Sequence, residues 1–545
     1  MHLRQPGIIW ILGILMACGR GQGGLEVSLV PPSSPMPVPG SSVRLTVRVK
    51  ADGPVTIHWL RNGVIIPGAR AAEFTLPQVV LEDAGAFQAQ VSDGAQTLVT
   101  EPVVLEPADR VFTVDSAEDD GPGTLREALA KAQADGFPGL SGILFRLPGP
   151  GPSVIRLARD LPPTTANLVI LGSFSHPVTL DGGGVRRPFF VQGGSLVLDL
   201  FTVAHGLGKG GNGPGGGGGA AGMGGAMFIN GGQVVLRRMT FRDNQALGGD
   251  SGFGSDGENG GGGGFGGDAP RAGGNGADGG FLAGEGGLGS LAGLPADDPE
   301  GGGPPTGDGA GAGAARGAPL ATFIGTWAHN LPGGNGDTSF GGGGGFSVGP
   351  EGGGGDGAFF GGGGGGSGGY VPVYLTPTPR PGETPSWVLF NGSGSGEGGF
   401  CGGQGSKASL GLTGRGGGGA GAGGAIFLRD GTLDLFQCRF ERNRAQGGLG
   451  AQRGLGKGGA IFIYKCDPDR SPPTAVAYEA LCKAQSYVGN FTQDKLEEPA
   501  FDNDNYYIAQ TPITLNLDPA LKRRYERYRL GLREGESAPL GPWLW

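Results

Sequence analysis

Four residues near the middle of the chain could provide acid–base chemistry. Carboxylates and imidazoles that meet in one groove can cleave a polysaccharide by general acid–base catalysis. The candidates are scattered along the sequence, so catalysis requires that the fold bring them together. They are Asp181, Asp199, His205 and Asp243.

Most of these candidates also have a structural interpretation. Asp181 precedes three glycines in the stretch LDGGG, which is typical of a turn residue. Asp199 stands between two leucines, so strand alternation predicts that it points outward. Asp243 and two further charged residues, Arg237 and Arg238, have the pattern of solvated strand faces. We therefore favour a non-enzymatic protein and keep a polysaccharide lyase or glycoside hydrolase as the alternative.

The sequence predicts no cofactor. The stretches DGENGGGGG and DGGFLAGEGG place acidic residues among glycines, but the regular nonapeptide of calcium-binding repeats is absent, so calcium remains only an alternative. The net charge of −9 argues against nucleic acid as a partner. Cys466 and Cys482 could close a short disulfide loop in an oxidising compartment or remain two buried thiols, and both alternatives stay open.

The first 24 residues are typical of an export signal. A short apolar run follows His2 and Arg4 and is too short to span a bilayer. The stretch Leu-Met-Ala-Cys that ends at Cys18 resembles the lipobox of bacterial lipoproteins, which implies a lipid anchor on Cys18. The alternative is an ordinary signal peptide with an incidental cysteine. We expect export to the bacterial outer membrane, the cell surface or the medium, with membrane contact only through the lipid.

Residues 25–106 show short alternating apolar runs separated by Gly and Pro, as in an antiparallel sandwich. Trp59 and the later stretch LEDAGAFQAQV resemble the immunoglobulin-like domain, although its two bridging cysteines are replaced by Val47 and Ala89. The core would therefore rest on apolar side chains alone: Leu45, Val47, Trp59, Phe87 and Ala89.

Residues 107–247 begin with a single amphipathic helix that Thr124 could cap, with Glu127 completing a capping box. Short strands with apolar residues two apart then recur every ten or so residues. Strands this short must stack to bury their apolar faces, and the helix is the natural cap for the open end of the stack. The segment resembles the start of the parallel β-helix that follows the CSLREA motif of bacterial surface proteins.

An internal repeat extends this pattern. GGAMFINGGQVVLRRMTFRDNQALGG at 224–249 returns as GGAIFLRDGTLDLFQCRFERNRAQGG at 423–448, and GKGGAIFIYKC begins a third copy. The repeat resembles that of chlamydial polymorphic outer-membrane proteins, which implies glycine turns, core phenylalanines and an asparagine ladder. Its defining residues are Gly224, Gly225, Phe241, Asn244, Gly423, Gly424, Phe440, Asn443, Gly458 and Gly459.

The predicted fold is all-β: an immunoglobulin-like sandwich followed by a right-handed parallel β-helix, a solenoid like that of pectin lyases. A Gly-rich insertion at 248–422 leaves one turn and returns to the next, and we expect it to be mostly loose with local aromatic anchoring. Further turns fill 423–517, and a final helix and tail fill 518–545, with Asp518 as N-cap. The predicted function is a surface structural or adhesive protein whose partner is a glycan or another cell-surface protein.

Overall fold

A computed structural model of the chain describes two kinds of β-structure and one α-helix. Contacts divide it into two compact units, with the boundary between Pro107 and Ala108. The described residues are 24–252 apart from 31, 33–34, 81–82, 174–175 and 214, together with 263, 369–373, 386–390, 395–398, 401–406, 414–464, 475–476, 486–492 and 505–508.

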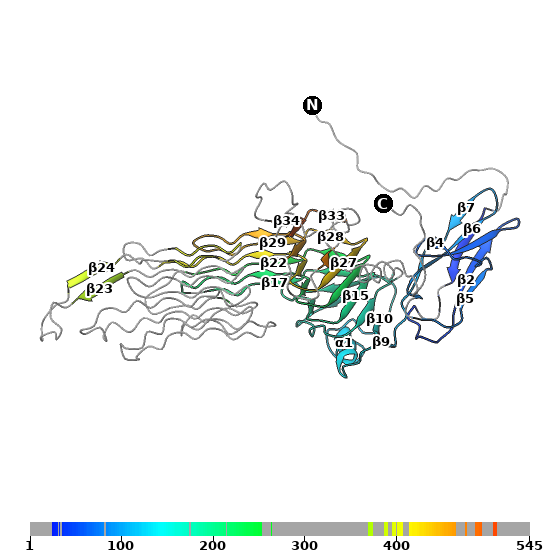
Figure 1. The fold of residues 1–545 in the computed structure, drawn as a ribbon, viewed down its shortest axis with the longest axis horizontal. Helices are drawn as coiled ribbons and strands as arrows, with labels where there is room; N and C mark the ends of the chain where they lie inside the picture. Colours follow the sequence, from blue (N-terminus) through cyan, green and yellow to red (C-terminus); the bar gives the residue numbers. More distant parts are fainter. Residues whose placement is uncertain are drawn as a thin grey trace, which may run out of the picture. The chain divides into compact units, whose positions relative to one another are not determined.

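The first unit contains only antiparallel sheets (Figure 1). One sheet has the order β1 (Glu26–Val30), β2 (Val43–Lys50) and β5 (Glu73–Leu76). The other has the order β4 (Val64–Ile65), β3 (Thr56–Arg61), β6 (Gly85–Ser92) and β7 (Thr97–Val99), and β8 (Val103–Leu105) also pairs with β6. This arrangement is that of an immunoglobulin-like domain.

The core of this domain is apolar and lacks a disulfide. All five residues predicted for the core lie in one buried cluster. Trp59 is fully buried, and its indole Nε1 donates a hydrogen bond to the carbonyl oxygen of Ala71 at 2.9 Å. Ala89 lies directly opposite Trp59 across the strand pair, so the small side chain leaves room for the large ring.

The second unit is built from parallel sheets. Sheet I has the order β9 (Arg110–Val114), β10 (Ser141–Phe145), β12 (Leu168–Leu171), β15 (Ser195–Asp199), β20 (Gln233–Arg237), β27 (Thr432–Phe436) and β32 (Ala475–Val476). Sheet II contains β11 (Ser153–Arg156), β13 (Val178–Asp181), β16 (Thr202–Ala204), β21 (Thr240–Arg242), β28 (Arg439–Glu441) and β33 (Ser486–Val488). Sheet III contains β14 (Phe189–Val191), β19 (Met227–Ile229), β26 (Ile426–Leu428), β31 (Ile461–Ile463) and β35 (Tyr506–Ile508).

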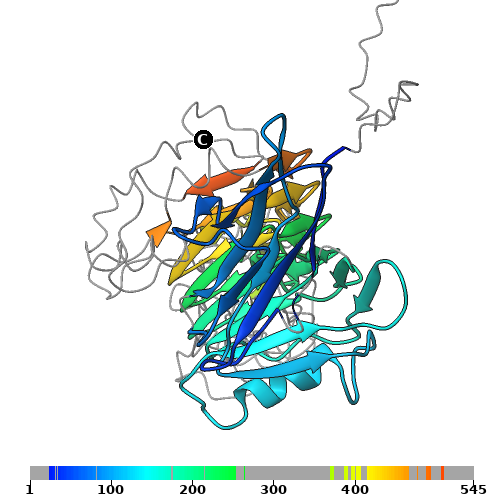
Figure 2. The same ribbon diagram turned by 90° about the vertical axis from the view of Figure 1, so that its right-hand side faces the viewer.

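From β14 onward, successive turns of the chain add one strand to each of these sheets in the same order. After β19 in sheet III, for example, the chain passes to β20 in sheet I and then to β21 in sheet II. The two copies of the repeat are adjacent turns, because β20 pairs with β27 and β21 pairs with β28 in parallel register. Figure 2 shows these strands stacked in chain order, and we call the whole arrangement the parallel stack.

The helix α1 (Leu125–Gln133) covers the first strands of the parallel stack (Figure 2). As predicted, the side chain of Thr124 accepts a hydrogen bond from the backbone N–H of Glu127. The carboxylate of Glu127 accepts in turn from Gly123 N at 2.9 Å. Apolar side chains of sheets I, II and III meet in the main core. The buried face of the helix joins this core through Leu125, Ala128, Leu129 and Ala132.

A second apolar cluster lies on the other face of sheet III. Four phenylalanine rings stack there one above another, with centroids 5.2 Å apart at each step. Alternate residues of each strand therefore enter the two clusters, so sheet III is buried on both faces. The column consists of Phe190, Phe228, Phe427 and Phe462.

Two small sheets lie on this side of sheet III: sheet V contributes Met223 and Ala422 to the second cluster, and sheet IV contacts sheet V. Sheet IV has the order β17 (Leu207–Lys209), β22 (Gln245–Leu247), β29 (Arg444–Gln446) and β34 (Phe491–Thr492). Sheet V has the order β18 (Gly222–Met223), β25 (Gly421–Ala422) and β30 (Gly456–Lys457). Together with the chain that extends from them, they form what we call the glycine layers: residues 207–213, 215–223, 245–252, 416–424 and 444–457.

The glycine layers are held by hydrogen bonds between layers as well as within them. Gly249 N donates to the carbonyl oxygen of Ala220 at 2.7 Å, Gly419 N to Gly249 at 3.0 Å and Gly448 N to Gly419 at 2.8 Å. An ideal Cβ on Gly249 would lie 1.9 Å from the carbonyl oxygen of Gly211. Sheets that carry side chains pack about 10 Å apart, so only glycine permits this spacing.

This finding concerns the ends of the predicted Gly-rich insertion. We expected 248–422 to be mostly loose, and both described ends of that interval, 248–252 and 416–422, belong to the hydrogen-bonded glycine layers. Inside the interval, β23 (Gly369–Val373) and β24 (Ser386–Phe390) form an antiparallel pair. Most of the interval lies outside the described residues, so for that part the expectation from composition stays a prediction.

Candidate functional site

The structure brings three of the four acid–base candidates together. Asp181 ends β13 in sheet II, and His205 and Asp243 directly follow β16 and β21 in the same sheet. The parallel register places His205 and Asp243 at the same position of neighbouring turns. Asp199 ends β15 in sheet I and lies at a different corner of the stack.

The backbone at this corner has an unusual conformation. The φ angles of His205, Asp243 and Arg442 are 49°, 56° and 50°, in the left-handed region that non-glycine residues seldom adopt. Gly489, at the same position of the next turn, has a φ of 62°. Because four successive turns share this conformation, it belongs to the corner and does not single out a catalytic residue.

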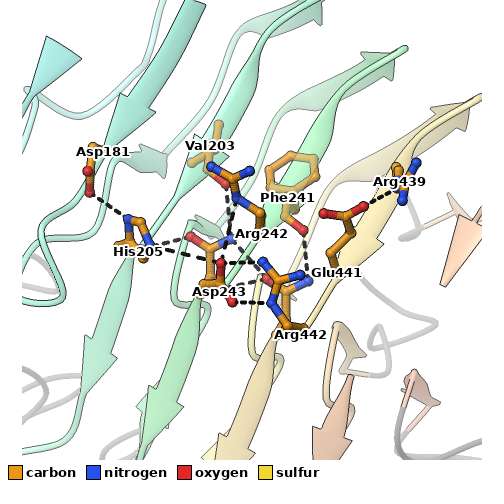
Figure 3. A network of polar contacts seen from close by, with 12 residues as sticks. Asp181, Val203, His205, Phe241, Arg242, Asp243, Arg439, Glu441 and Arg442 are labelled. Carbon is orange, nitrogen blue, oxygen red and sulfur yellow. Dashed lines mark hydrogen bonds and ion pairs between the residues drawn. The ribbon is translucent and has the colours of Figure 1, made fainter. Parts of the chain in front are cut away.

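Five charged or titratable side chains form what we call the corner cluster: Asp181, His205, Arg242, Asp243 and Arg442 (Figure 3). His205 Nδ1 lies 3.1 Å from Asp181 Oδ1, and His205 Nε2 lies 3.9 Å from Asp243 Oδ2. Arg442 donates to both oxygens of Asp243, at 2.7 and 2.8 Å. Arg242 Nε is 3.6 Å from Asp243 Oδ2. The cluster thus links four successive turns.

The electrostatics of the corner cluster favour a charged Asp243. The hydrogen bonds from Arg442 lower the pKa of Asp243 below its ordinary value, and the positive charges of Arg442, His205 and Arg242 act in the same direction against partial burial. The same contact raises the pKa of Arg442. Asp243 is therefore ionised at neutral pH and is not suited to act as a general acid.

The remaining two members also have structural partners. Asp181 Oδ1, the oxygen that faces His205, accepts a hydrogen bond from Gly183 N at 2.8 Å, so Asp181 is the turn residue that its sequence predicts. The imidazole of His205 is 47% exposed and could exchange a proton with solvent. As an acid–base site, the corner cluster could use His205 as the proton carrier.

Asp199 alternates with the core residues Leu196 and Leu198 and so faces away from the main core, as predicted, but it is not exposed to solvent. Its side chain is fully buried, and Arg238 Nε donates to Asp199 Oδ1 at 2.9 Å. Arg238 also contacts Asp199 Oδ2 through Nη2, and Arg237 Nε lies 3.3 Å from that oxygen. Asp199 is buried because two arginines of the next turn fold over the carboxylate, and buried charges require such partners.

The repeat asparagines form a buried ladder beside the corner cluster. Asn244 Nδ2 donates to Asn443 Oδ1 at 2.9 Å, and Asn443 Nδ2 donates to Asn490 Oδ1 at 3.0 Å. Asn490 Nδ2 donates to Asn505 Oδ1 at 3.1 Å. Sequence reasoning missed Asn490 because Tyr487 replaces the phenylalanine of Phe-x-x-Asn, although an aromatic-x-x-Asn search would have found it.

The repeat phenylalanines fill the main core directly below. The rings of Phe241 and Phe440 stack with centroids 5.2 Å apart, and Phe440 stacks on Tyr487 at the same spacing. Phe241 and Phe440 are fully buried. The aromatic column and the asparagine ladder thus run along the same turns.

The glycine pairs of the repeat have two distinct roles. The first glycine of each pair has a positive φ: 58° at Gly224, 66° at Gly423 and 64° at Gly458. The second approaches the next turn closely, since a Cβ on Gly225 would lie 2.3 Å from the carbonyl oxygen of Gly424. A Cβ on Gly424 would lie 2.0 Å from the carbonyl oxygen of Gly459.

Sequence reasoning also missed the arginine partners of Asp243. Asp243 and Arg442 both stand directly before the asparagine of Phe-x-x-Asn, in FRDN and FERN. Aligning the two copies therefore would have predicted a stacked pair of opposite charges. The signal was present in the sequence, and the structure confirms that the two copies are neighbouring turns in parallel register.

A shallow groove lies at another corner of the stack, where sheet III passes to sheet I. It has a volume of about 400 Å³, and no acid–base candidate lines it. Three successive turns of the stack each contribute three residues to its walls, and Asn167 contributes one more. The lining residues are Gly193, Gly194, Ser195, Gly231, Gly232, Gln233, Asp430, Gly431, Thr432 and Asn167.

Several predicted sites lie outside the described residues. They include Cys18, the pair Cys466 and Cys482, and the acidic residues of both stretches considered for calcium. Among the residues that the structure does describe, no group of three His, Cys, Asp or Glu side chains could hold a metal ion. No helix in the described part of the chain is long and apolar enough to cross a membrane.

Comparisons with known proteins concern only a small part of the chain. No protein-family model matches it. The chain is 35% identical over 107 residues to the advanced glycosylation end product-specific receptor of Rattus norvegicus and 34% identical over 107 residues to that of Mus musculus. Each match covers 18% of this chain and 26% of the receptor, so the chain spans about a quarter of the length of these relatives.

One solved structure also shows a limited likeness. It contains the three N-terminal domains of the highly immunogenic outer capsid protein (Hoc) of bacteriophage RB49. The match has 20% sequence identity and a TM-score of 0.14, and it covers 17% of this chain and 35% of the other.

Proposed function

We propose that this chain is an exported, non-enzymatic surface protein that binds a glycan or another cell-surface ligand. The observation that carries the proposal is the pairing within the corner cluster: Arg442 and Arg242 neutralise Asp243, and Asp181 serves a turn. Asp199 is buried under two arginines. The residues best suited to catalysis thus have structural partners, and the repeated faces of the stack remain for binding.

The proposed architecture of the second unit is a right-handed parallel β-helix with a pectin-lyase-like solenoid. Parallel register in all five sheets, a helix over the first turns and an asparagine ladder support it. These features agree with the resemblance to CSLREA-type and polymorphic outer-membrane proteins. A crystal structure would test the handedness directly.

The proposed role of the immunoglobulin-like domain is a stalk or a second binding module. Its support is the 107-residue likeness to a protein named as a receptor, together with the antiparallel sandwich. Immunoglobulin-like domains serve many functions, so the fold alone does not choose between these roles.

The proposed localisation is the outer face of a bacterial envelope, with Cys18 as a lipidated anchor. The support is the stretch LMAC after a short apolar run. Labelling of cells with a palmitate analogue should mark the wild type and should not mark Cys18→Ser. Persistence of the label in Cys18→Ser would exclude this anchor.

The binding proposal is tested by a glycan array run beside a reducing-end release assay on pectin, alginate and chondroitin. We expect binding to at least one glycan or to a cell surface, without release of reducing ends. The non-enzymatic proposal would be overturned if the wild type released reducing ends and a substitution of one acid–base candidate abolished that release.

A polysaccharide lyase or glycoside hydrolase is the second candidate. The convergence of Asp181, His205 and Asp243 at one corner favours it, because clustered acids and bases are what such enzymes require. His205→Gln would abolish turnover if this cluster were catalytic. The same variant should leave glycan binding unchanged if the binding proposal holds.

A further inference from the structure

The shallow groove where sheet III passes to sheet I carries a column of polar side chains. The first residues of β15, β20 and β27 are Ser195, Gln233 and Thr432, and the parallel register aligns them across three successive turns. Asn167 stands at the same position of the preceding turn, because β12 and β15 pair in the same register. Adjacent turns lie about 4.8 Å apart, so the groove offers polar groups at a regular spacing along the stack.

Two members of this column keep their hydrogen-bonding groups for a ligand. Ser195 Oγ donates to Asn167 Oδ1 at 3.1 Å, and Asn167 Nδ2 donates to the carbonyl oxygen of Pro138 at 2.9 Å, so both of these side chains have partners. No hydrogen bond among the described residues uses the side chain of Gln233 or Thr432, and neither residue is buried. An amide and a hydroxyl each offer both donors and acceptors.

The position two residues before each of these strands shapes the floor of the groove. It is Gly193 before β15, Gly231 before β20 and Asp430 before β27. Gly193 has no positive φ, and a Cβ built there would meet no atom within 4 Å. Neither the backbone conformation nor the packing requires glycine at this position. Its effect is the open space that a side chain would otherwise fill.

The charge of the groove restricts the ligand. Among the described residues that line it, Asp430 is the single charged one, and its Oδ1 accepts from Gly431 N at 2.8 Å. A polyanion such as a polyuronate would meet this carboxylate with no Lys or Arg in the lining, which disfavours its binding. A carboxylate is by contrast a strong acceptor for hydroxyl groups.

The backbone at the groove is already paired between turns. Gln233 N donates to the carbonyl oxygen of Gly194 at 2.8 Å, and Thr432 N donates to that of Gly232 at 2.9 Å. An extended peptide binds by pairing with an open strand edge, and these amides do not offer one. No aromatic side chain stands among the described lining residues, so an apolar ligand lacks an anchor. Amide, hydroxyl and carboxylate groups suit a hydroxyl-rich ligand best.

We propose that this groove binds a neutral linear glycan that lies along the stack. Gln233 and Thr432 exchange hydrogen bonds with its hydroxyl groups, Asp430 accepts from a further hydroxyl, and Gly193 leaves room for a sugar ring. The volume of about 400 Å³ lies in the range of sites for small ligands, so the groove holds a short segment of the glycan. This inference rests on the proposed glycan-binding function and assigns a site to it.

Isothermal titration calorimetry of the full-length chain tests the site. The probes are cellohexaose, xylohexaose, mannohexaose and chitohexaose, and we expect at least one of them to bind the wild type. Gly193→Phe fills the floor of the groove and should weaken that binding by more than about tenfold. Gln233→Ala with Thr432→Val removes two hydrogen-bonding side chains and should weaken it about tenfold or more.

The matched control is Gly53→Phe, which lies in the first unit. Gly53 likewise has no positive φ and no atom within 4 Å of an added Cβ, so this variant should bind the glycan as the wild type does. Thermal unfolding of every variant should match that of the wild type. The double variant replaces unburied groups, so it keeps the test decisive if Gly193→Phe unfolds.

The outcomes separate this proposal from the proposed function. Neutral glycan binding that the groove variants retain would overturn the groove as the site and leave glycan binding intact. Binding only to anionic probes, such as oligomers of alginate or hyaluronan, would also overturn it. If the wild type bound none of these glycans, this proposal would fail, and the proposed function would fail with it unless the protein bound a cell surface.

Discussion

Asp243 and Arg442 are 199 residues apart in the chain and yet form a two-point ion pair at the corner of two neighbouring turns. Such geometry fixes both charges more firmly than a single contact does. The pair also shows why the charged side chains of the corner cluster need not be catalytic. Each side chain has a partner in the next turn, and the pairing stabilises the stack in the direction of its growth.

The first prediction is that Asp243→Asn destabilises the protein at neutral pH by about 1 kcal/mol. Because Arg442 lowers the folded-state pKa of Asp243, the stabilisation is fully present above the unfolded-state value of about 3.9. It is lost as the pH falls through the lower folded-state value. Urea unfolding of both proteins at several pH values should therefore show a difference that disappears in acid.

The control for this prediction is a double-mutant cycle. Arg442→Gln should show the same pH dependence, and the double variant should lose little more stability than either single variant. A difference between wild type and Asp243→Asn that stayed constant down to strongly acidic pH would show that the ion pair contributes nothing.

The second prediction concerns the asparagine ladder. Asn443 is fully buried, its Oδ1 accepts from Asn244 N and Nδ2, and its Nδ2 donates to Phe241 and Asn490. Asn443→Ala leaves several buried polar groups without these partners and should cost about 3 kcal/mol. Chemical denaturation measures the loss. The exposed Gln192→Ala serves as control and should change stability by less than about 0.5 kcal/mol.

At the scale of elements, the glycine layers replace side-chain packing by close backbone approach. Their hydrogen bonds run between layers, as from Gly419 N to the carbonyl of Gly249, so each extended chain bonds in more than two directions. The phenylalanine column of sheet III connects these layers to the rest of the stack through Ala221, Met223, Ala420 and Ala422.

The third prediction follows from this spacing. A methyl group at residue 249 would meet the carbonyl oxygen of Gly211 at 1.9 Å, so Gly249→Ala should destabilise the glycine layers by about 1–3 kcal/mol. Gly193→Ala is the matched control, because a Cβ there meets nothing within 4 Å. The control should be neutral or slightly stabilising.

Thermal unfolding and hydrogen exchange of residues 245–252 measure both variants. Equal stability of the two variants would mean that the layers can move apart at little cost. Faster exchange confined to the Gly249→Ala variant would show that close approach, and not glycine content as such, holds them together.

At the scale of the whole molecule, the two units have separate cores. The apolar cluster of the immunoglobulin-like domain draws its buried residues only from Leu25 to Leu105. The main core of the stack begins at Val114. A domain with its own core can in principle fold alone.

The fourth prediction is that residues 24–107, expressed alone, fold cooperatively into the same sandwich. Dispersed amide resonances and a single cooperative unfolding transition would show this. Trp59→Ala removes the largest buried ring of the cluster and should cost about 3–5 kcal/mol, enough to unfold a domain of this size. An isolated domain without dispersed resonances would mean that its fold requires the second unit.

Much of the architecture could be predicted from the sequence alone. Period-two alternation identified the strands, Thr124 and Glu127 identified the start of α1, and Trp59 with Phe87 identified the core of the first unit. These signals are local, since side-chain direction and helix capping depend on the backbone within a few residues. The all-β prediction, antiparallel first and parallel later, is confirmed.

Only the tertiary structure decided which side chains meet across turns. Asp199 is buried because arginines of the next turn cover it, and Asp243 is ionised because Arg442 lies one turn away. The glycine layers likewise depend on chains that approach from distant parts of the sequence. Composition and local periodicity describe the residues of one turn. Stacking determines which residues of other turns lie beside them, and the burial of a side chain, its ion pairs and the close approach of backbones all depend on those neighbouring residues.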